Sequence, residues 1–191
     1  MLAAGAWSDT LAQSAGVVLP IRTGVYQMLR STPAAPGLLR PVLGALGRQL
    51  SLKQLPDGAF LLGGGWPGDT TTDRMSFTMR EESIAGGWAA ASAILPAVGA
   101  QQLAASWCGL EAESFDAVPL IGLAVGVTGL FLAVGFSGHG FAIAPAVGEA
   151  LAEELLGRTA SALDKLRPSR AVGLDLKAVL GNPKSKIGNP K

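Results

Sequence analysis

Residues 130–148 read LFLAVGFSGHGFAIAPAVG, and this stretch decides the fold class. An apolar strand is predicted to end at Phe136, a loop follows over 137–140, and a helix is predicted to start near Phe141. A helix N-terminus carries unpaired N–H groups and about half a positive charge. Gly138 and Gly140 lack a Cβ, so a ligand can approach their backbone closely. The pattern predicts a site for an anion or a developing negative charge, and a tight turn without any ligand is the alternative.

The run over 117–136 has twenty residues without a formal charge, which is long enough to cross a bilayer as a helix. Glycines and β-branched residues interrupt it, however, and no Lys or Arg flanks it to fix an orientation. The spacing predicts two buried strands, 119–125 and 130–136, joined by a turn at 126–129. We therefore expect a core hairpin and no membrane span. Because the first basic residue is Arg22, we expect no signal peptide and a cytoplasmic location.

The remaining chain mixes helix and strand patterns. The predicted elements are a helix over 8–15 capped by Ser8 or Asp9, strands over 17–19 and 25–29, a hairpin over 50–62 that turns at 56–58, a helix from Thr72 or Asp73 to Leu95, and a last helix that Gly157 ends. Elements of both kinds are interleaved, so the predicted class is α/β or α+β.

The composition excludes several functions. The 191 residues include 15 Lys and Arg, 14 Asp and Glu, one His and one Cys. A near-zero net charge argues against nucleic-acid binding, and one His with one Cys argues against a metal site. The net charge is −5 over residues 1–157 and +6 over 158–191, where Gly-Asn-Pro-Lys occurs twice. We expect a basic, disordered tail over 171–191.

A series of short blocks resembles the FAD-dependent amine and amino-acid oxidoreductases, the family of D-amino-acid oxidase, glycine oxidase and the sarcosine oxidase β subunit. The blocks, in chain order, are residues 3–8 (AAGAWS), 19–21 (LPI), 27–29 (QML), 107–111 (WCGLE), 119–122 (PLIG), 135–141 (GFSGHGF) and 166–170 (LRPSR). Residues 63–66 and 107–111 are most similar to the opine, hydroxyproline and hydrogen-cyanide-synthase branches.

The resemblance implies an FAD cofactor, a small amine or amino-acid substrate, and hydride transfer from the substrate α carbon to the flavin. It implies cofactor contacts from one group of residues: Ala4, Gly5, Gly135, Ser137, Gly138, His139, Gly140 and Phe141. Tyr26, Trp66 and His139 are the substrate-side candidates, although packing in the core is the alternative for Tyr26 and Trp66. No catalytic residue is assigned.

The resemblance also implies the domain organisation, which is the C-terminal part of a Rossmann-type FAD-binding domain interleaved with a mixed or antiparallel-sheet substrate domain. The expected segments are 1–19, the end of the FAD-binding domain; 20–118, the substrate domain; 119–170, a returning hairpin and helix that contact the flavin; and 171–191, the tail.

Two departures from the family pattern stand out. The sequence contains no G-x-G-x-x-G fingerprint, and Glu111-Ala112 stands where many relatives carry Arg-Pro. We therefore expect a C-terminal part of such an enzyme. The alternative is a non-catalytic subunit that completes a flavoprotein supplied by a companion chain.

Overall fold

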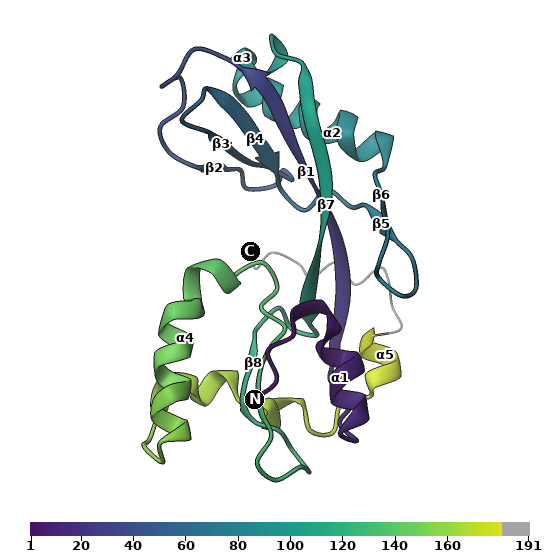
Figure 1. Ribbon diagram of the computed structural model, residues 1–191, viewed down its shortest axis with the longest axis vertical. Coiled ribbons are helices and arrows are strands. Elements are labelled where there is room, and N and C mark those ends of the chain that lie inside the picture. Colours follow the sequence, from purple (N-terminus) through teal and green to yellow (C-terminus); the bar gives the residue numbers. More distant parts are fainter. Residues whose placement is uncertain (181–191) are drawn as a thin grey trace. The chain divides into compact units, whose positions relative to one another are not determined.

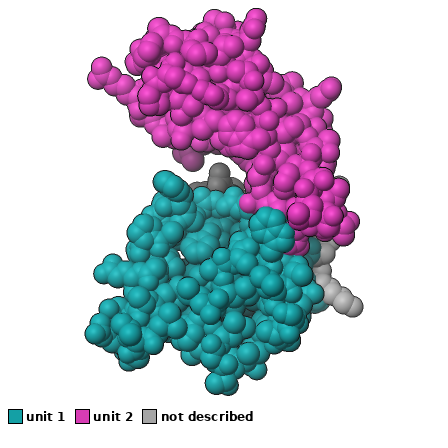
Figure 2. All heavy atoms as spheres, viewed as in Figure 1, with its two compact units in different colours: residues 1–24, 111–191 teal, residues 25–110 magenta. Residues whose placement is uncertain are grey.

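The structure is a computed structural model that describes residues 1–180. The chain forms two compact units, coloured separately in Figure 2. Unit 1 combines residues 1–24 with the chain from residue 111 onward, and unit 2 is the continuous segment Val25–Leu110. The boundaries lie inside two long strands, at 24/25 and 110/111, where the sequence placed domain boundaries near 20 and 118. The assignment of these units to a flavin part and a substrate part stays a prediction.

The elements follow one another along the chain as labelled in Figure 1. Unit 1 contains η1 (Gly5–Trp7), α1 (Ser8–Ser14), β8 (Leu120–Leu123), β9 (Phe131–Val134), α4 (Gly140–Leu155), η2 (Ser161–Leu166), η3 (Pro168–Ala171) and α5 (Leu176–Leu180). Unit 2 contains β2 (Leu43–Gly44), β3 (Ser51–Gln54), β4 (Ala59–Gly63), β5 (Asp69–Thr70), β6 (Phe77–Thr78), α2 (Glu81–Ile94) and α3 (Pro96–Gly99). Strands β1 (Ile21–Pro33) and β7 (Leu103–Ser114) belong to both units. The mixture of helices and antiparallel sheets confirms the predicted class.

The strand prediction near the start of β1 was partly wrong. Strand β1 covers the predicted strand 25–29 and continues beyond it at both ends, whereas residues 17–19 form no strand. Val17 and Leu19 are nevertheless buried, because they pack in the core of unit 1. These residues are buried but do not pair in a sheet, which explains why their apolar pattern wrongly predicted a strand.

Unit 2 is built on a five-stranded sheet with the order β2-β3-β4-β1-β7. The predicted hairpin at its centre is confirmed: β3 and β4 pair antiparallel, and the Ala59 N–H donates to the Asp57 carboxylate at 3.0 Å across the turn. Helices α2 and α3 cover one face of the sheet (Figure 1). The buried core between them includes Leu52, Phe60 and Leu62 from the strands.

Helix α2 begins at Glu81, so the predicted start at Thr72 or Asp73 was wrong. The Asp73 carboxylate instead accepts the Met75 N–H at 3.0 Å and closes the turn between β5 and β6. Asp and Ser favour both helix caps and tight turns, because the same side-chain oxygen satisfies the local backbone in either case.

A glycine pair in the middle of α2 has a packing explanation. The Trp66 indole lies directly over Gly86 and Gly87: a Cβ added at Gly86 would come within 2.4 Å of the ring. The Trp66 Nε1–H donates to the Gln49 carbonyl at 2.9 Å, which fixes the ring there. The glycines that weaken the helix by propensity thus admit an aromatic ring.

The predicted apolar hairpin of unit 1 is confirmed as β8 and β9, which pair antiparallel from Leu120↔Val134 to Leu123↔Phe131. Its side chains alternate between two cores. Leu120, Leu132 and Val134 face a cluster that contains Ala12 of α1, while Ile121 and Ala133 face α4 and η2. Because both faces are buried, the sequence reads as one continuous apolar run. Within residues 1–180, no helix is both long and apolar enough to cross a membrane.

The structure corrects the predicted cap of α1 and agrees with the predicted end of α4. The N-cap position of α1 is Trp7, and no side chain caps this helix within the described part of the chain, so the predicted cap at Ser8 or Asp9 was wrong. Helix α4 ends as predicted, with Gly157 at φ +79° just beyond it. Helix α5 lies within the segment predicted as the tail, and residues 181–191 lie outside the described residues.

Candidate functional site

The loop that precedes α4 has an unusual backbone. Gly135, Ser137 and Gly138 have φ values of +70°, +52° and +86°, so three of four consecutive residues are left-handed. At Gly135 an added Cβ would lie 3.1 Å from both Ile21 and Ser114, so glycine is needed there for space as well as conformation. Ser137 is not a glycine and therefore needs external contacts to hold its conformation.

The N-terminal segment runs alongside β9 and reaches the edge of the β8–β9 sheet at which the loop before α4 begins. Leu2 pairs parallel with Leu132, and its N–H donates to the Phe131 carbonyl at 2.7 Å. In parallel neighbours the carboxyl ends meet at one edge. Ala4 and Gly5 therefore emerge beside the start of the loop, so these cofactor candidates lie at the same edge as those from Gly135 to Phe141.

The start of α4 presents free hydrogen-bond donors at this edge. His139 occupies the N-cap position, and no side chain caps the helix within residues 1–180. The His139 N–H donates to the Phe136 carbonyl at 3.0 Å, but the N–H groups of Gly140 and Phe141 have no acceptor among the described residues. The Phe141 side chain is fully exposed. A helix of 16 residues thus points its positive end, with two available donors, at the loop.

A carboxylate already contacts the loop. The Gly138 N–H donates to the Glu111 side chain, which reaches it from the unit 1 end of β7. A negative group next to a helix N-terminus is favourable, and this contact places one just before the start of α4. The sequence analysis singled out Glu111 only as a departure from the family pattern, and no local signal predicts its contact with Gly138.

A partly buried ion pair includes a second carboxylate of the same strand. Glu113 is 9% exposed, and its carboxylate accepts a hydrogen bond from Nε of Arg22 at 2.7 Å. Separating the pair would leave the buried Glu113 carboxylate without its charged partner. The Arg22 side chain, to which the sequence analysis gave no role, therefore forms an ion pair with Glu113.

The substrate-side candidates Tyr26 and Trp66 belong to unit 2, whereas His139 belongs to unit 1. The structure brings the backbones of Tyr26 and Trp66 together: Tyr26 pairs with Pro67, and the Gln27 N–H donates to the Trp66 carbonyl at 2.7 Å. Because the Trp66 ring is packed on α2, its contacts favour the packing interpretation.

Two other features of the described chain lack the chemistry of a reactive site. An apolar cavity of about 220 Å³ in unit 1 is lined by residues including Val17, Leu120 and Leu132, and no ionisable side chain lines it. In unit 2, burial raises the pKa of the Cys108 thiol, so the reactive thiolate is disfavoured there.

The comparisons with known proteins decide the family. Residues 1–154 match the family described as FAD dependent oxidoreductase, DAO. The chain belongs to this family. The match includes the loop and the start of α4, and it confirms the resemblance drawn from the short blocks.

Among curated proteins, glycine oxidase of Pseudomonas aeruginosa is 35% identical over 160 residues, which cover 83% of this chain and 42% of that enzyme. FAD-dependent oxidoreductase domain-containing protein 1 of Bos taurus is 30% identical over 179 residues, covering 81% of this chain and 35% of that protein. The chain thus spans less than half the length of these relatives.

Solved structures agree with this placement. The L-proline dehydrogenase of P. horikoshii aligns with a TM-score of 0.78 and 28% identity, covering 88% of this chain and 45% of that one. Glycine oxidase from Geobacillus kaustophilus aligns with a TM-score of 0.72 and 19% identity, covering 90% and 45%, which shows a shared fold.

The residues at the carboxyl edge of the sheet fit the cofactor that the family implies. The flavin ring carries carbonyl and ring-nitrogen acceptors along one edge, and these match the N–H donors of Gly140 and Phe141. At Gly138 the missing Cβ leaves the backbone accessible to a flat ring, and the helix dipole favours negative charge on that ring.

Proposed function

We propose that this chain supplies the flavin-contacting loop and the substrate unit of an FAD-dependent oxidoreductase that oxidises the C–N bond of a small amino acid or secondary amine. The observation that carries the proposal is the family match over residues 1–154, with two N–H donors unpartnered, in the described chain, at the helix start within it. The relatives named as glycine oxidase and L-proline dehydrogenase support an amino acid or cyclic amine as the substrate class.

Bound FAD would supply the hydride acceptor for the carbon that carries the substrate nitrogen. The chain's own contribution is electrostatic and positional. The α4 N-terminus would donate from Gly140 and Phe141 and stabilise negative charge on the ring edge, which favours the reduced form. A role for the chain in binding and orientation, with the redox chemistry left to the cofactor, agrees with a sequence that has one His and few other acid–base groups.

The proposed cofactor contacts are those at the sheet edge: Ala4, Gly5, Gly135, Ser137, Gly138, His139, Gly140 and Phe141. Their shared position at the carboxyl ends of the Leu2 segment and β9 supports this set. For the substrate side we keep Tyr26 and His139, while the packing of Trp66 on α2 makes it a supporting residue of unit 2.

FAD binding by the full 191-residue chain tests the proposal directly. The sharpest variant is Phe141→Pro, because proline removes the backbone N–H yet is tolerated in the first turn of a helix. Phe141→Ala is the matched control, since it removes the same exposed side chain and keeps the N–H. We expect the proline variant to bind FAD about tenfold more weakly than the alanine variant, measured by titration of flavin absorbance and by calorimetry.

Equal affinities of the two variants would remove the proposed role of this donor. Failure of the native chain to bind FAD at saturating concentration would refute the function for this chain. Bleaching of bound flavin by glycine or L-proline under anaerobic conditions would support oxidation of that substrate. Binding without bleaching by any amine would favour the non-catalytic alternative.

A further inference from the structure

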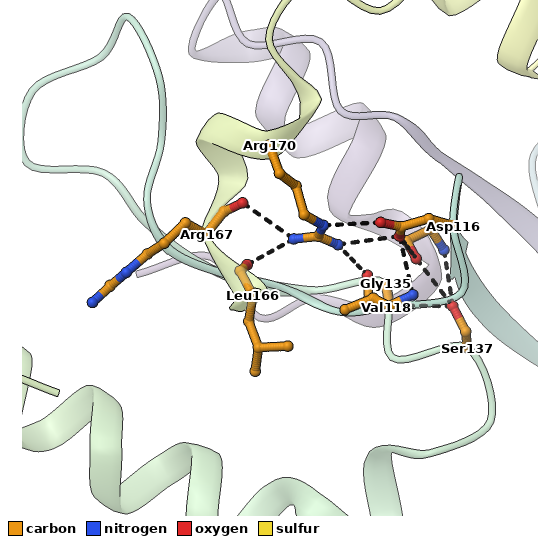
Figure 3. A network of polar contacts seen from close by, with 8 residues as sticks. Asp116, Val118, Gly135, Ser137, Leu166, Arg167 and Arg170 are labelled. Carbon is orange, nitrogen blue, oxygen red and sulfur yellow. Dashed lines mark hydrogen bonds and ion pairs between the residues drawn. The ribbon is translucent and has the colours of Figure 1, made fainter. Parts of the chain in front are cut away.

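A polar network joins the C-terminal η3 helix to the loop before α4 (Figure 3). At its centre, Arg170 donates to the Asp116 carboxylate from Nε at 2.9 Å and from Nη2 at 3.2 Å. Its other guanidinium hydrogens go to main-chain carbonyls, including that of Leu166 at 2.8 Å and that of Val118. The guanidinium also lies 5.6 Å from the centroid of the Phe115 ring. So many directed contacts fix the Arg170 side chain in one geometry.

The Asp116 carboxylate, held by Arg170, in turn accepts hydrogen bonds from its neighbours. Its Oδ1 accepts the Ser114 hydroxyl at 3.2 Å and the Val118 N–H at 3.0 Å. The second contact spans Ala117, whose φ is +61°, an uncommon value for a residue with a Cβ. The carboxylate therefore holds both ends of a strained turn and the Ser114 side chain.

Ser114 is the link to the flavin-side loop. Its N–H donates to Ser137 Oγ at 3.0 Å, and the Ser137 hydroxyl donates to the Gly135 carbonyl at 3.0 Å. The Ser137 N–H donates to the Ala112 carbonyl at 3.1 Å. These bonds hold Ser137 in its left-handed conformation, which sets the direction in which the chain enters α4.

We propose that Arg170 and Asp116 are positioning residues for the loop 135–141: through Ser114 and Ser137 they aim the helix-start N–H groups at the flavin edge. The flavin part rests on the proposed function, whereas the positioning of the loop does not. Arg170 and Ser137 are 33 positions apart in the sequence, so this role follows from the fold and not from any local motif.

Amide hydrogen exchange of the full chain without FAD tests the positioning. The variants are Arg170→Met, Arg170→Lys, which keeps the charge but not the planar fork, and Asp116→Asn. Arg158→Met is the matched control, because Arg158 pairs with Glu153 on the exposed end of α4. We expect exchange of the Ser114 and Ser137 amides to rise at least about tenfold in Arg170→Met and Asp116→Asn, less in Arg170→Lys, and not in the control.

Unchanged exchange at these two amides would overturn the positioning role. A uniform rise across unit 1 would also overturn it, because that pattern belongs to a purely structural residue. If Arg170→Met does not fold, Asp116→Asn and Ser114→Ala decide by the same readout.

The flavin part is tested by the midpoint potential of FAD bound to the same variants. A lower potential in Arg170→Met than in Arg158→Met, partly restored in Arg170→Lys, supports it; equal potentials with faster exchange overturn it. A chain that binds no FAD refutes the proposed function, while the exchange result still decides the positioning.

Discussion

Gly86→Ala gives the sharpest test of how unit 2 is packed, because two opposing effects meet at one residue. An alanine in a helix interior is favoured over glycine by about 0.5–1 kcal/mol. The new methyl carbon would, however, lie 2.4 Å from Cζ3 and 2.5 Å from Cη2 of Trp66. The ring is held in place by the bond from its N–H to the Gln49 carbonyl. Overpacking of this kind costs about 1–3 kcal/mol, so we expect Gly86→Ala to destabilise the protein.

The sign of the effect should reverse when the ring is removed. In a Trp66→Ala background the added methyl no longer meets the indole ring, and Gly86→Ala should then stabilise the chain by up to about 1 kcal/mol. Because the helix-propensity gain is the same in both backgrounds, the coupling between the two substitutions should equal the overpacking cost of about 1–3 kcal/mol. Gly148→Ala in α4 is the control, because a Cβ there meets nothing within 4 Å and should stabilise in either background.

Urea unfolding followed by far-UV circular dichroism measures these free energies for the four members of the cycle and the control. If Gly86→Ala is neutral or stabilising with Trp66 present, or has the same effect in both backgrounds, the argument that the glycines exist to admit the indole ring is refuted.

Three further substitutions test the site and the core. Glu111→Gln removes the negative charge that contacts the Gly138 amide in the loop before α4, so FAD should bind about tenfold more tightly by absorbance titration; the exposed Glu149→Gln is the control, and equal affinities would contradict a competition between this carboxylate and FAD. Burial acts to raise the pKa of Asp116, but the hydrogen bonds from its arginine partner and from a backbone N–H outweigh it and hold the pKa below 3.8. The stability that this carboxylate contributes is therefore present above about pH 3.8 and lost as the pH falls through the lower folded pKa; Asp116→Asn should cost about 2 kcal/mol at pH 7 and progressively less as the pH falls below 3.8, and a pH-independent cost in urea titrations would refute the linkage. Ile121→Ala should cost about 2–5 kcal/mol and Leu123→Ala, two positions along the same strand but 49% exposed, under about 1 kcal/mol; similar losses of unfolding free energy would contradict the burial of Ile121 against α4 and η2.

Much of unit 1 could be predicted because its signals are local. The hairpin at 120–134 is an apolar run cut by turn glycines, and the last helix follows directly from a glycine-rich loop. The start of α2 could not be predicted in the same way. Asp73 suits a helix cap and a tight turn equally well, and only the pairing of β5 with β6 selects the turn.

In the candidate site, too, the features with local signals could be predicted and the contacts between distant residues could not. The glycines of the loop and the helix start are visible in the sequence as a pattern. The contact between Glu111 and Gly138 joins residues 27 apart, and the pair of Asp116 with Arg170 joins residues 54 apart. Charge and spacing along one sequence do not specify such partners, because many other carboxylates and cations are equally available.

The two-sided burial of the β8–β9 hairpin sets an order of events during synthesis of the chain. The first residues of unit 1, Leu2 and Ala12, pack against a hairpin that the ribosome adds more than a hundred residues later. Unit 2 is continuous and contains its own core, so it can fold while unit 1 is still incomplete. We therefore expect residues 2–12 to find their partners in this core only after residue 134 has been synthesised, and to be exposed to proteolysis on nascent chains that end before it.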